Sequence, residues 1–150
     1  MTNNQTYILK CKGINSVIFQ QCLDIRRKVF IEEQNIPKEL ENDVYDSVAT
    51  HYLLILNNIP PINIGTARWR ETDKGIKLER FAVLKEFRNK GFGKIILNEI
   101  IKDIIDFNKL IYLHAQKDAV KFYLKNNFKI TGQPFYEANI EHYLMVYNTQ

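Results

Sequence analysis

Two hydrophobic periodicities alternate along the chain, and this alternation limits the folds that it can adopt. Apolar side chains recur every three or four positions in residues 17–31 and 91–108, which is typical of helices buried on one face. Shorter apolar stretches, such as residues 51–56 and 110–115, are typical of strands. Strands that alternate with helices predict an α/β or α+β fold, in which helices cover one sheet.

The remaining elements follow from turn residues and apolar patterning. Strands are predicted at residues 7–11, 51–56, 62–70, 76–83, 110–115, 128–130 and 142–147, and helices at residues 17–31, 91–108 and 117–126. The strands at 62–70 and 76–83 are expected to form a hairpin, because Thr72-Asp73-Lys74-Gly75 lies between them. An acidic segment with room for a short helix follows Pro37.

A single domain over residues 1–150 accounts for the length. A chain of this size buries roughly 70% of its unfolded surface, so it needs no metal or disulfide for stability. The first ten residues, MTNNQTYILK, lack the basic start and apolar stretch of a signal peptide. No apolar run approaches the roughly 20 residues that span a bilayer. We therefore expect a cytoplasmic protein with no membrane segment, no bound metal and reduced cysteines.

The charged residues are segregated along the chain. Residues 32–46 contain six acidic residues and one lysine, a local net charge of −5. Residues 85–94 contain four basic residues and one acidic residue, a local net charge of +3. This arrangement suits two ligands of opposite charge, although two solvated loops explain the same charges. A nucleic-acid-binding domain usually has one broad basic face, so nucleic acid is not expected as a partner.

The junction between the second hairpin strand and the longest helix has the pattern of an anion site. Its motif is Arg88-x-x-Gly91-x-Gly93, and Lys90 and Lys94 add positive charge. A helix N-terminus exposes unpaired N–H groups, and glycine lets a phosphate approach the backbone. The alternative is a glycine turn with a solvated basic surface.

The motif in this loop is similar to the R/Q-x-x-G-x-G/A motif of the GNAT superfamily of acyl-CoA N-acyltransferases, and the resemblance covers nearly the whole chain. The stretch HAQKDAVKFYLKNNFKITG resembles the family's strand, short helix and next strand, with Asn127 in place of the usual glycine. Two further motifs resemble a subgroup of uncharacterised bacterial acetyltransferases. They are R-x-x-V-F-x-x-E-Q at residues 26–34 and F-x-E-A-x-I-x-H at residues 135–142, where Asn139 replaces a glycine.

The resemblance implies a mixed, mostly antiparallel sheet of about seven strands that splays after its fourth strand, with about four helices on its two faces. It places coenzyme A in the splayed gap, with the pyrophosphate on the backbone N–H groups of residues 88–94. The pantetheine arm then pairs with the backbone of Phe81 and Val83, and residues 119–123 line the other wall. The residues implied for acetyl-CoA are Phe81, Ala82, Val83, Arg88, Asn89, Lys90, Gly91, Phe92, Gly93, Lys94, Ala119 and Phe122.

Acyl transfer to an amine needs an acid, a base and a donor for the oxyanion. The backbone N–H of Phe81 or Val83 is the expected oxyanion donor. The resemblance implies Tyr123 as the acid that protonates the departing thiolate, and the alternative is a buried ring whose hydroxyl is already hydrogen-bonded. Glu79 is the candidate base, directly or through a water, because strand alternation places it on the same face as Phe81 and Val83.

Glu79 also has a structural alternative. A turn centred on Asp73 and Lys74 sets Glu79 opposite Arg68 as a cross-strand ion pair, whereas a bulge at the turn opposes Arg68 to Arg80, a like-charge clash. We favour the ion pair, which is compatible with a catalytic role if Arg68 steers the carboxylate. Pairing lowers the pKa of a carboxyl group and makes it a poorer base.

The resemblance builds the acceptor side from the first helix, its exit and the C-terminal motif. The candidate acceptor-binding residues are Arg26, Glu33, Gln34, Arg68, Glu137 and His142. The acidic segment beside them favours a cationic acceptor such as an amine, although solvation of a helix face explains the same charges. A lone histidine at a strand start, such as His142, is more often structural. His51 and His114 are interpreted as ordinary strand residues.

Together these patterns predict an N-acetyltransferase that transfers an acetyl group from acetyl-CoA to an amine by direct attack in a ternary complex. No cysteine is placed to carry the acyl group, which disfavours a covalent enzyme intermediate. The acceptor is expected to be a small molecule or a peptide, and the protein a monomer or a homodimer. A non-catalytic acyl-CoA-binding or sensing module is the alternative. A basic nucleic-acid-binding protein is disfavoured because it leaves the glycine loop unexplained.

Overall fold

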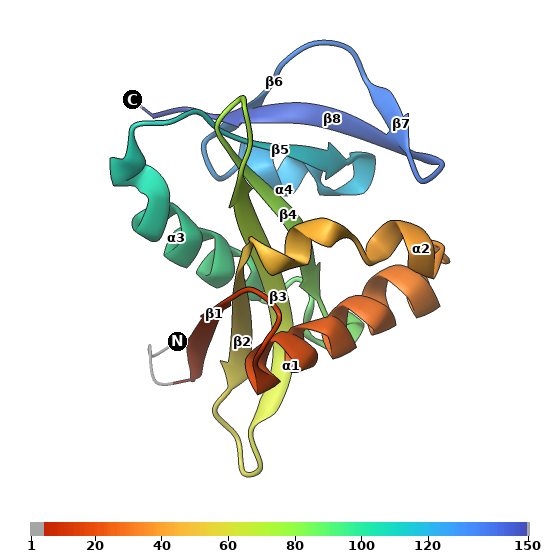
Figure 1. Ribbon diagram of the computed structural model, residues 1–150, viewed down its shortest axis with the longest axis vertical. Helices are drawn as coiled ribbons and strands as arrows, with labels where there is room; N and C mark the ends of the chain where they lie inside the picture. The colour runs from red at the N-terminus through yellow and green to blue at the C-terminus, as the bar shows by residue number, and fades with distance from the viewer. Residues whose placement is uncertain (1–4, 150) are drawn as a thin grey trace.

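One mixed sheet organises the computed structural model, which describes residues 5–149. The strands follow the order β1-β2-β3-β4-β5-β8-β6, and β7 pairs with β8 (Figure 1). The strands are β1 (Thr6–Lys12), β2 (Thr50–Leu56), β3 (Ile62–Glu71), β4 (Ile76–Val83), β5 (Ile111–Gln116), β6 (Phe128–Ile130), β7 (Phe135–Glu137) and β8 (Ile140–Tyr147). The helices are α1 (Val17–Arg26), α2 (Lys38–Glu41), α3 (Phe92–Ile104) and α4 (Val120–Leu124). A π-helix, η1 (Arg27–Glu33), continues α1, and short 3-10 turns are η2 (Val44–Ser47), η3 (Lys85–Phe87), η4 (Ile105–Phe107) and η5 (Lys117–Ala119).

This architecture confirms the predicted fold class and the order of the predicted elements. Two details differ from the expectation. The predicted helix at 17–31 is an α-helix that continues as a π-helix from Arg27, and β7 forms a strand that the sequence did not predict. Residues 1–4 and 150 of the predicted domain, which include the start of MTNNQTYILK, lie outside the described residues.

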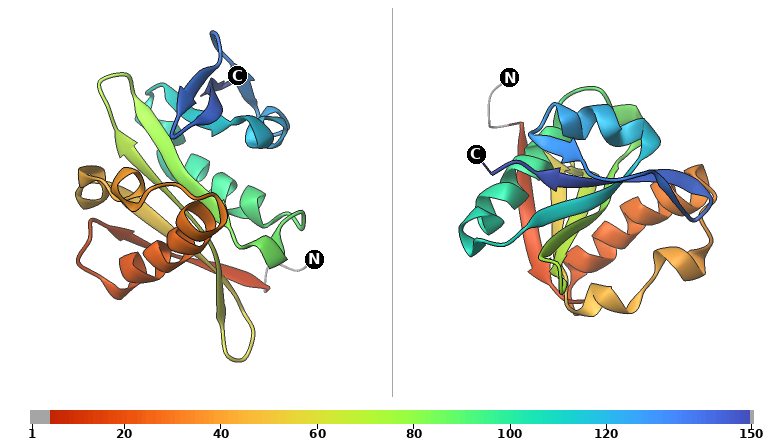
Figure 2. Two further views of the ribbon diagram at one scale, coloured as in Figure 1. Left: turned by 90° about the vertical axis from the view of Figure 1, so that its right-hand side faces the viewer. Right: turned by 90° about the horizontal axis from the view of Figure 1, so that it is seen from above.

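Two hydrophobic clusters lie on the two faces of the sheet. On one face, the apolar side of α3, with Ile96, Leu97, Ile100 and Ile104 fully buried, packs against the strands. On the other face, Cys22 and Ile25 of α1 and Val29 of η1 pack on β2. Figures 1 and 2 show α1 and α3 on opposite sides of the N-terminal strands. Amphipathic helices and a half-apolar sheet thus bury their apolar faces against each other.

The sheet opens between β4 and β5. These strands pair in parallel only from Ile76 opposite Ile111 to Leu78 opposite Leu113. Beyond Leu78, residues 79–83 of β4 pair with β3 on one side and have no strand partner on the other within residues 5–149. The C-terminal strands, coloured blue in Figure 2, therefore diverge from the N-terminal strands. The predicted splay after the fourth strand is confirmed, and it leaves open backbone donors and acceptors along one edge of β4.

A β-bulge at Arg80 corrects the predicted alternation along β4. Thr66 lies opposite Ala82 but Arg68 lies opposite Glu79, so β4 has one extra residue, and Arg80 adopts a left-handed φ of 58°. A bulge reverses the side on which the following residues project. Phe81 consequently packs with the α3-side cluster and Ala82 with the α1-side cluster. Glu79 therefore does not share a face with Phe81, contrary to the expectation.

No helix within residues 5–149 is long and apolar enough to cross a membrane. Over the same residues, no group of three or more His, Cys, Asp and Glu side chains is arranged to hold a metal ion.

Candidate active site

A cavity of about 430 Å³ lies where β4 and β5 diverge. Leu78 and Leu113, the last paired residues of the two strands, line its inner end. Residues of η1, α2 and the β7–β8 turn line it on one side of the sheet, and residues of η5 and α4 on the other. The predicted site residues that line it are Gln34, Glu79, Phe81, Ala119, Tyr123, Glu137 and His142. The splay therefore brings together residues of the predicted cofactor side and of the predicted acceptor side.

The N-terminus of α3 is open to solvent beside this region. Gly91, with a left-handed φ of 85°, is the N-cap, and no side chain caps the helix. The first N–H groups of a helix have no partner within it. A Cβ built on Gly91 meets no atom within 4 Å, and Asn89, Lys90 and Lys94 are exposed. Open amides, glycine and nearby lysines are features that suit a phosphate group.

The side chain of Arg88 is half-buried and bonded to other parts of the protein, whereas Asn89 and Lys90 are exposed. Its guanidinium donates to both carboxylate oxygens of Glu33, at 2.5 and 2.8 Å, and its Nε donates to the carbonyl of Val83 at 2.8 Å. These bonds tie the loop to the end of η1. Glu33, predicted for the acceptor side, is held at this ion pair and does not line the cavity.

Tyr123 projects from α4 into the wall of the cavity. Its side chain is 6% exposed, and its ring packs edge-on against Phe81, Phe122 and Phe128, with centroid distances of 5.0 to 6.0 Å. The hydroxyl makes no hydrogen bond to any residue in the range 5–149, so the alternative of a hydroxyl already tied off is not observed. Burial raises the pKa of Tyr123, which keeps the phenol protonated and able to donate.

Glu79 is held by cations on both carboxylate oxygens. Oε1 accepts from Arg68 at 2.9 Å and from Arg70 at 2.7 Å, and Oε2 lies 3.1 Å from the ammonium of Lys77. Burial opposes ionisation, but the bond from Arg70 and the charges of Arg68 and Lys77 outweigh it and lower the pKa of Glu79 to about 2. The predicted Arg68–Glu79 cross-strand pair is confirmed. A carboxyl with so low a pKa is a weak base.

Arg26 and Arg68, predicted to contact the acceptor, lie in a buried ion-pair network instead. Each is 1% exposed, and neither lines the cavity. Arg26 donates to Glu41 at 2.7 Å and to Asp46 at 2.8 Å, and Arg68 donates to Asp43 at 2.9 Å. Buried charges of this kind are found paired, because an unpaired one is strongly destabilising. The network anchors the acidic segment to the sheet and pairs Glu41, Asp43 and Asp46 with arginine side chains.

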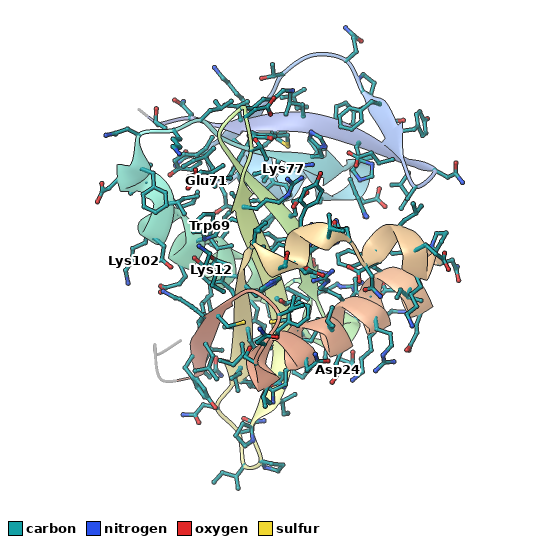
Figure 3. All side chains as sticks on the ribbon, in the orientation of Figure 1. Lys12, Asp24, Trp69, Glu71, Lys77 and Lys102 are labelled. Carbon is teal, nitrogen blue, oxygen red and sulfur yellow. The ribbon has the colours of Figure 1, made fainter. Side chains whose placement is uncertain are left out.

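Five polar residues that line the cavity were not among the predicted site residues. Lys77 lies at the junction of β4 and β5, opposite Tyr112, and is labelled in Figure 3. Gln116 exchanges two hydrogen bonds with Gln34, at 2.9 and 3.2 Å, and so joins β5 to the end of η1. The other three are Glu41, Arg80 and His114.

His114 lines the cavity and lies 2.7 Å from Glu137, measured from Nδ1 to Oε1. It alternates along β5 with the buried residues Leu113 and Ala115. That alternation was the available signal that His114 projects away from the core, on the side where the sheet opens.

Comparisons with known proteins identify the family. The model of the acetyltransferase (GNAT) domain matches residues 14–149. The chain is 38% identical to the uncharacterized protein YyaT of Bacillus subtilis over 129 residues, which cover 83% of this chain and 85% of YyaT. It is 36% identical to the uncharacterized N-acetyltransferase YjcF of the same organism, over 81% of this chain and 86% of YjcF.

Solved structures are similar in fold. Escherichia coli ElaA superposes with a TM-score of 0.82 at 22% identity, covering 95% of this chain and 99% of ElaA. A GNAT family acetyltransferase from Elizabethkingia anophelis, described with acetyl-CoA bound, superposes with a TM-score of 0.62 at 19% identity over 96% of each chain. The match to the domain model, the two Bacillus relatives and the splayed sheet agree, and the chain belongs to the GNAT family of acetyltransferases.

Proposed function

We propose that this protein is an N-acetyltransferase that transfers an acetyl group from acetyl-CoA to the primary amine of a small acceptor, by direct attack in a ternary complex. The observation that carries the proposal is the cavity between β4 and β5, which is lined from both sides of the sheet. Two reactants that enter from opposite sides meet there in one place, which supports direct transfer. Cys11 and Cys22 do not line the cavity, which argues against an acyl-enzyme intermediate.

Acetyl-CoA supplies an acyl group already activated as a thioester. The residues proposed to hold it are the open amides of residues 89–94, the edge of β4 at residues 81–83, and Ala119 and Phe122 at the N-cap and within α4. That edge of β4 has no strand partner within residues 5–149, and the Val83 carbonyl on it accepts from Arg88. Gly91 fits this role because nothing lies within 4 Å of the position of its absent Cβ, so the backbone is accessible to a phosphate. Gly93 fits because a Cβ at this position would already lie 3.4 Å from the ring of Phe122, which leaves little room for a larger residue between the loop and α4.

The acid and the oxyanion donor are proposed on the cofactor side. Tyr123 donates a proton to the leaving thiolate, because its hydroxyl is protonated, makes no hydrogen bond to residues 5–149 and lies on the cavity wall. The backbone N–H of Phe81 is the proposed donor to the oxyanion. It follows the bulge at Arg80, on the edge of β4 that faces the cavity.

The acceptor side is proposed to select a small amine by size and hydrogen bonding rather than by strong negative charge. Glu79 stays ionised between Arg68, Arg70 and Lys77, and we assign it a role in the charge balance of the cavity floor. Gln34, Glu137 and His142 are the remaining predicted residues that line this side.

The test is thiol release from acetyl-CoA with a panel of small primary amines, together with calorimetric titration of acetyl-CoA. Turnover with at least one amine supports the proposal. Tight acetyl-CoA binding with no turnover by any amine would indicate the sensing module instead. Absence of binding would refute the assignment of the cavity and of the α3 N-terminus.

A further inference from the structure

We propose that His114, oriented by Glu137, is the general base that deprotonates the ammonium group of the acceptor. The inference rests on the proposed acetyltransferase function, and it replaces Glu79, the base expected from the sequence. An amine must be neutral to attack a thioester, and most primary amines are protonated at neutral pH, so the acceptor side needs a group that takes a proton.

Two of the three carboxylates that line the cavity, Glu79 and Glu41, are already paired with arginine or lysine, and the third, Glu137, contacts His114. Both oxygens of Glu79 contact arginine or lysine. Glu41, which is 2% exposed, accepts from Arg26 at 2.7 Å and from Arg80 at 3.0 Å. A proton on either group would break contacts with buried cations, which makes these carboxylates unsuitable as bases.

The contact between His114 and Glu137 sets the form of the imidazole. Nδ1 of His114 lies 2.7 Å from Oε1 of Glu137, and an ionised carboxylate can only accept. The proton of the neutral ring is therefore assigned to Nδ1, and Nε2 keeps its lone pair. No other hydrogen bond to the ring is formed within residues 5–149, and the side chain is 26% exposed on the cavity wall.

The ring is held by packing as well as by Glu137. Phe135 of β7 packs edge-on against His114, with a centroid distance of 4.9 Å. Glu137 lies two residues further along the same strand, so β7 supplies both the carboxylate and the aromatic support. A ring that is fixed in orientation presents its free nitrogen in one direction, which favours proton transfer.

His114 lies on the opposite side of the sheet from Tyr123. Its neighbours Leu113 and Ala115 belong to the α3-side core that includes Tyr123, whereas His114 and Gln116 project to the other side, where Gln116 meets Gln34 of the η1 end. A base on the acceptor side and an acid on the cofactor side match the two proton transfers that amide formation requires. In the proposed step, Nε2 takes one proton from the ammonium, Glu137 stabilises the resulting imidazolium, and the half-buried ring then releases that proton to solvent. The neutral amine bonds to the thioester carbon, the carbon–sulfur bond breaks, and the second proton that the nitrogen loses balances the one that Tyr123 gives to the thiolate.

The charged and titratable groups around His114 come from every neighbouring strand. They are Lys77 on β4, Tyr112 on β5, Glu137 on β7 and His142 on β8. His142 is the rival base, since its Nδ1 contacts the carbonyl of Ile140 at 2.7 Å and leaves Nε2 available. A carbonyl stabilises an imidazolium less than a carboxylate does, so His114 is the assigned base.

The first test reads the imidazole directly and needs no turnover. Long-range ¹H–¹⁵N correlation spectra of the wild-type protein should show neutral His114 with its proton on Nδ1. In Glu137→Gln the share of neutral His114 rings with the proton on Nδ1 should fall, because the amide can donate to Nδ1 as well as accept from it. Glu141→Gln, at a half-buried carboxylate that accepts from Tyr143 at 2.6 Å, is the matched control and should leave that share unchanged. A proton on Nε2 in the wild-type protein, or a share that Glu137→Gln does not change, would overturn the assignment.

The second test uses the amine that gives the highest turnover. His114→Gln should lower kcat/KM at least about 100-fold with unchanged acetyl-CoA affinity, and Glu137→Gln should lower kcat/KM by a smaller factor, again with unchanged acetyl-CoA affinity. A His114→Gln variant within about threefold of wild type would overturn the proposal, as would a larger loss of kcat/KM in His142→Gln than in His114→Gln. If the wild-type protein turns over no amine, the proposed function fails and this assignment fails with it. If the wild-type protein is active but either contrary result is obtained, only the assignment of His114 as the base is refuted.

Discussion

Replacing Tyr123 by phenylalanine should separate catalysis from stability. The substitution removes one oxygen and keeps the ring, whose edge-on contacts with Phe81, Phe122 and Phe128 persist. The hydroxyl makes no hydrogen bond to residues 5–149, so its loss leaves no partner unsatisfied there. The free energy of unfolding should therefore change by less than about 0.5 kcal/mol.

The effect on turnover should be much larger. If Tyr123 protonates the departing thiolate, its removal should lower kcat by about 10² to 10⁴, which corresponds to about 3 to 5 kcal/mol in the activation barrier. Acetyl-CoA affinity should stay within about twofold of wild type, because the ring remains in place. By contrast, Tyr123→Ala should cost about 3 to 5 kcal/mol of stability, because it removes the ring and leaves a cavity in the core.

Three measurements check this prediction. Thiol release gives kcat, calorimetric titration gives acetyl-CoA affinity, and urea denaturation gives the free energy of unfolding. Tyr147→Phe is a matched control, because Tyr147 contacts the same Phe128, at a centroid distance of 5.2 Å, but does not line the cavity. Equal turnover of Tyr123→Phe and wild type at every pH would refute the role as acid. A loss of more than about 2 kcal/mol of stability would show that the hydroxyl has a structural partner.

Three further perturbations test the phosphate loop, the ion-pair network and the charge of Glu79. Gly91→Val and Gly132→Val should each lower the free energy of unfolding by about 1 to 2 kcal/mol, because both glycines have a left-handed φ and open surroundings. Only Gly91→Val should also lower acetyl-CoA affinity, at least about tenfold. Equal effects of the two variants on affinity would contradict the loop assignment. Arg26→Met should lower the free energy of unfolding by about 3 kcal/mol, because it leaves buried carboxylates with fewer partners, and Arg27→Met, at an exposed site, should change it by less than about 0.5 kcal/mol in the same denaturation assay. Because the pKa of Glu79 is lowered from 4.5 to about 2, its contribution to stability is complete above pH 4.5 and declines as the pH falls toward 2. The loss of the Glu79 contribution should make the free energy of unfolding about 2 kcal/mol lower at pH 3 than at pH 6. An equal free energy of unfolding at the two pH values would contradict the ion pairs of Glu79.

Features set by neighbouring residues could be predicted. The apolar stripe of α3 and the glycines before it defined a helix with an open N-terminus. The turn at Asp73 and Lys74, together with the charges of Arg68 and Glu79, defined the register of the hairpin. Both depend on residues close in sequence, where local geometry leaves few alternatives.

Features set by distant residues could not be predicted. The bulge at Arg80 accompanies hydrogen bonds from its guanidinium to Glu41 and Asp43, which lie more than thirty residues earlier in the chain. Strand β7 has three residues and is defined only by its pairing with β8, so it has no pattern long enough to detect. The contact between His114 and Glu137 depends on that pairing.

The order of the elements and the glycine loop before the longest helix were determined by the sequence alone, because periodicity and turn chemistry act over a few residues at a time. The splay of the sheet was implied by the resemblance to the GNAT superfamily. Which acidic groups remain free was decided only by the tertiary structure. Folding pairs Arg26 with Asp46 and Arg68 with Asp43. It also sets Glu79 among three cations. The same folding sets His114 beside Glu137 on the cavity wall. The physical reason is that proton affinity depends on burial and on charges within a few ångströms, and only the folded chain brings those charges together.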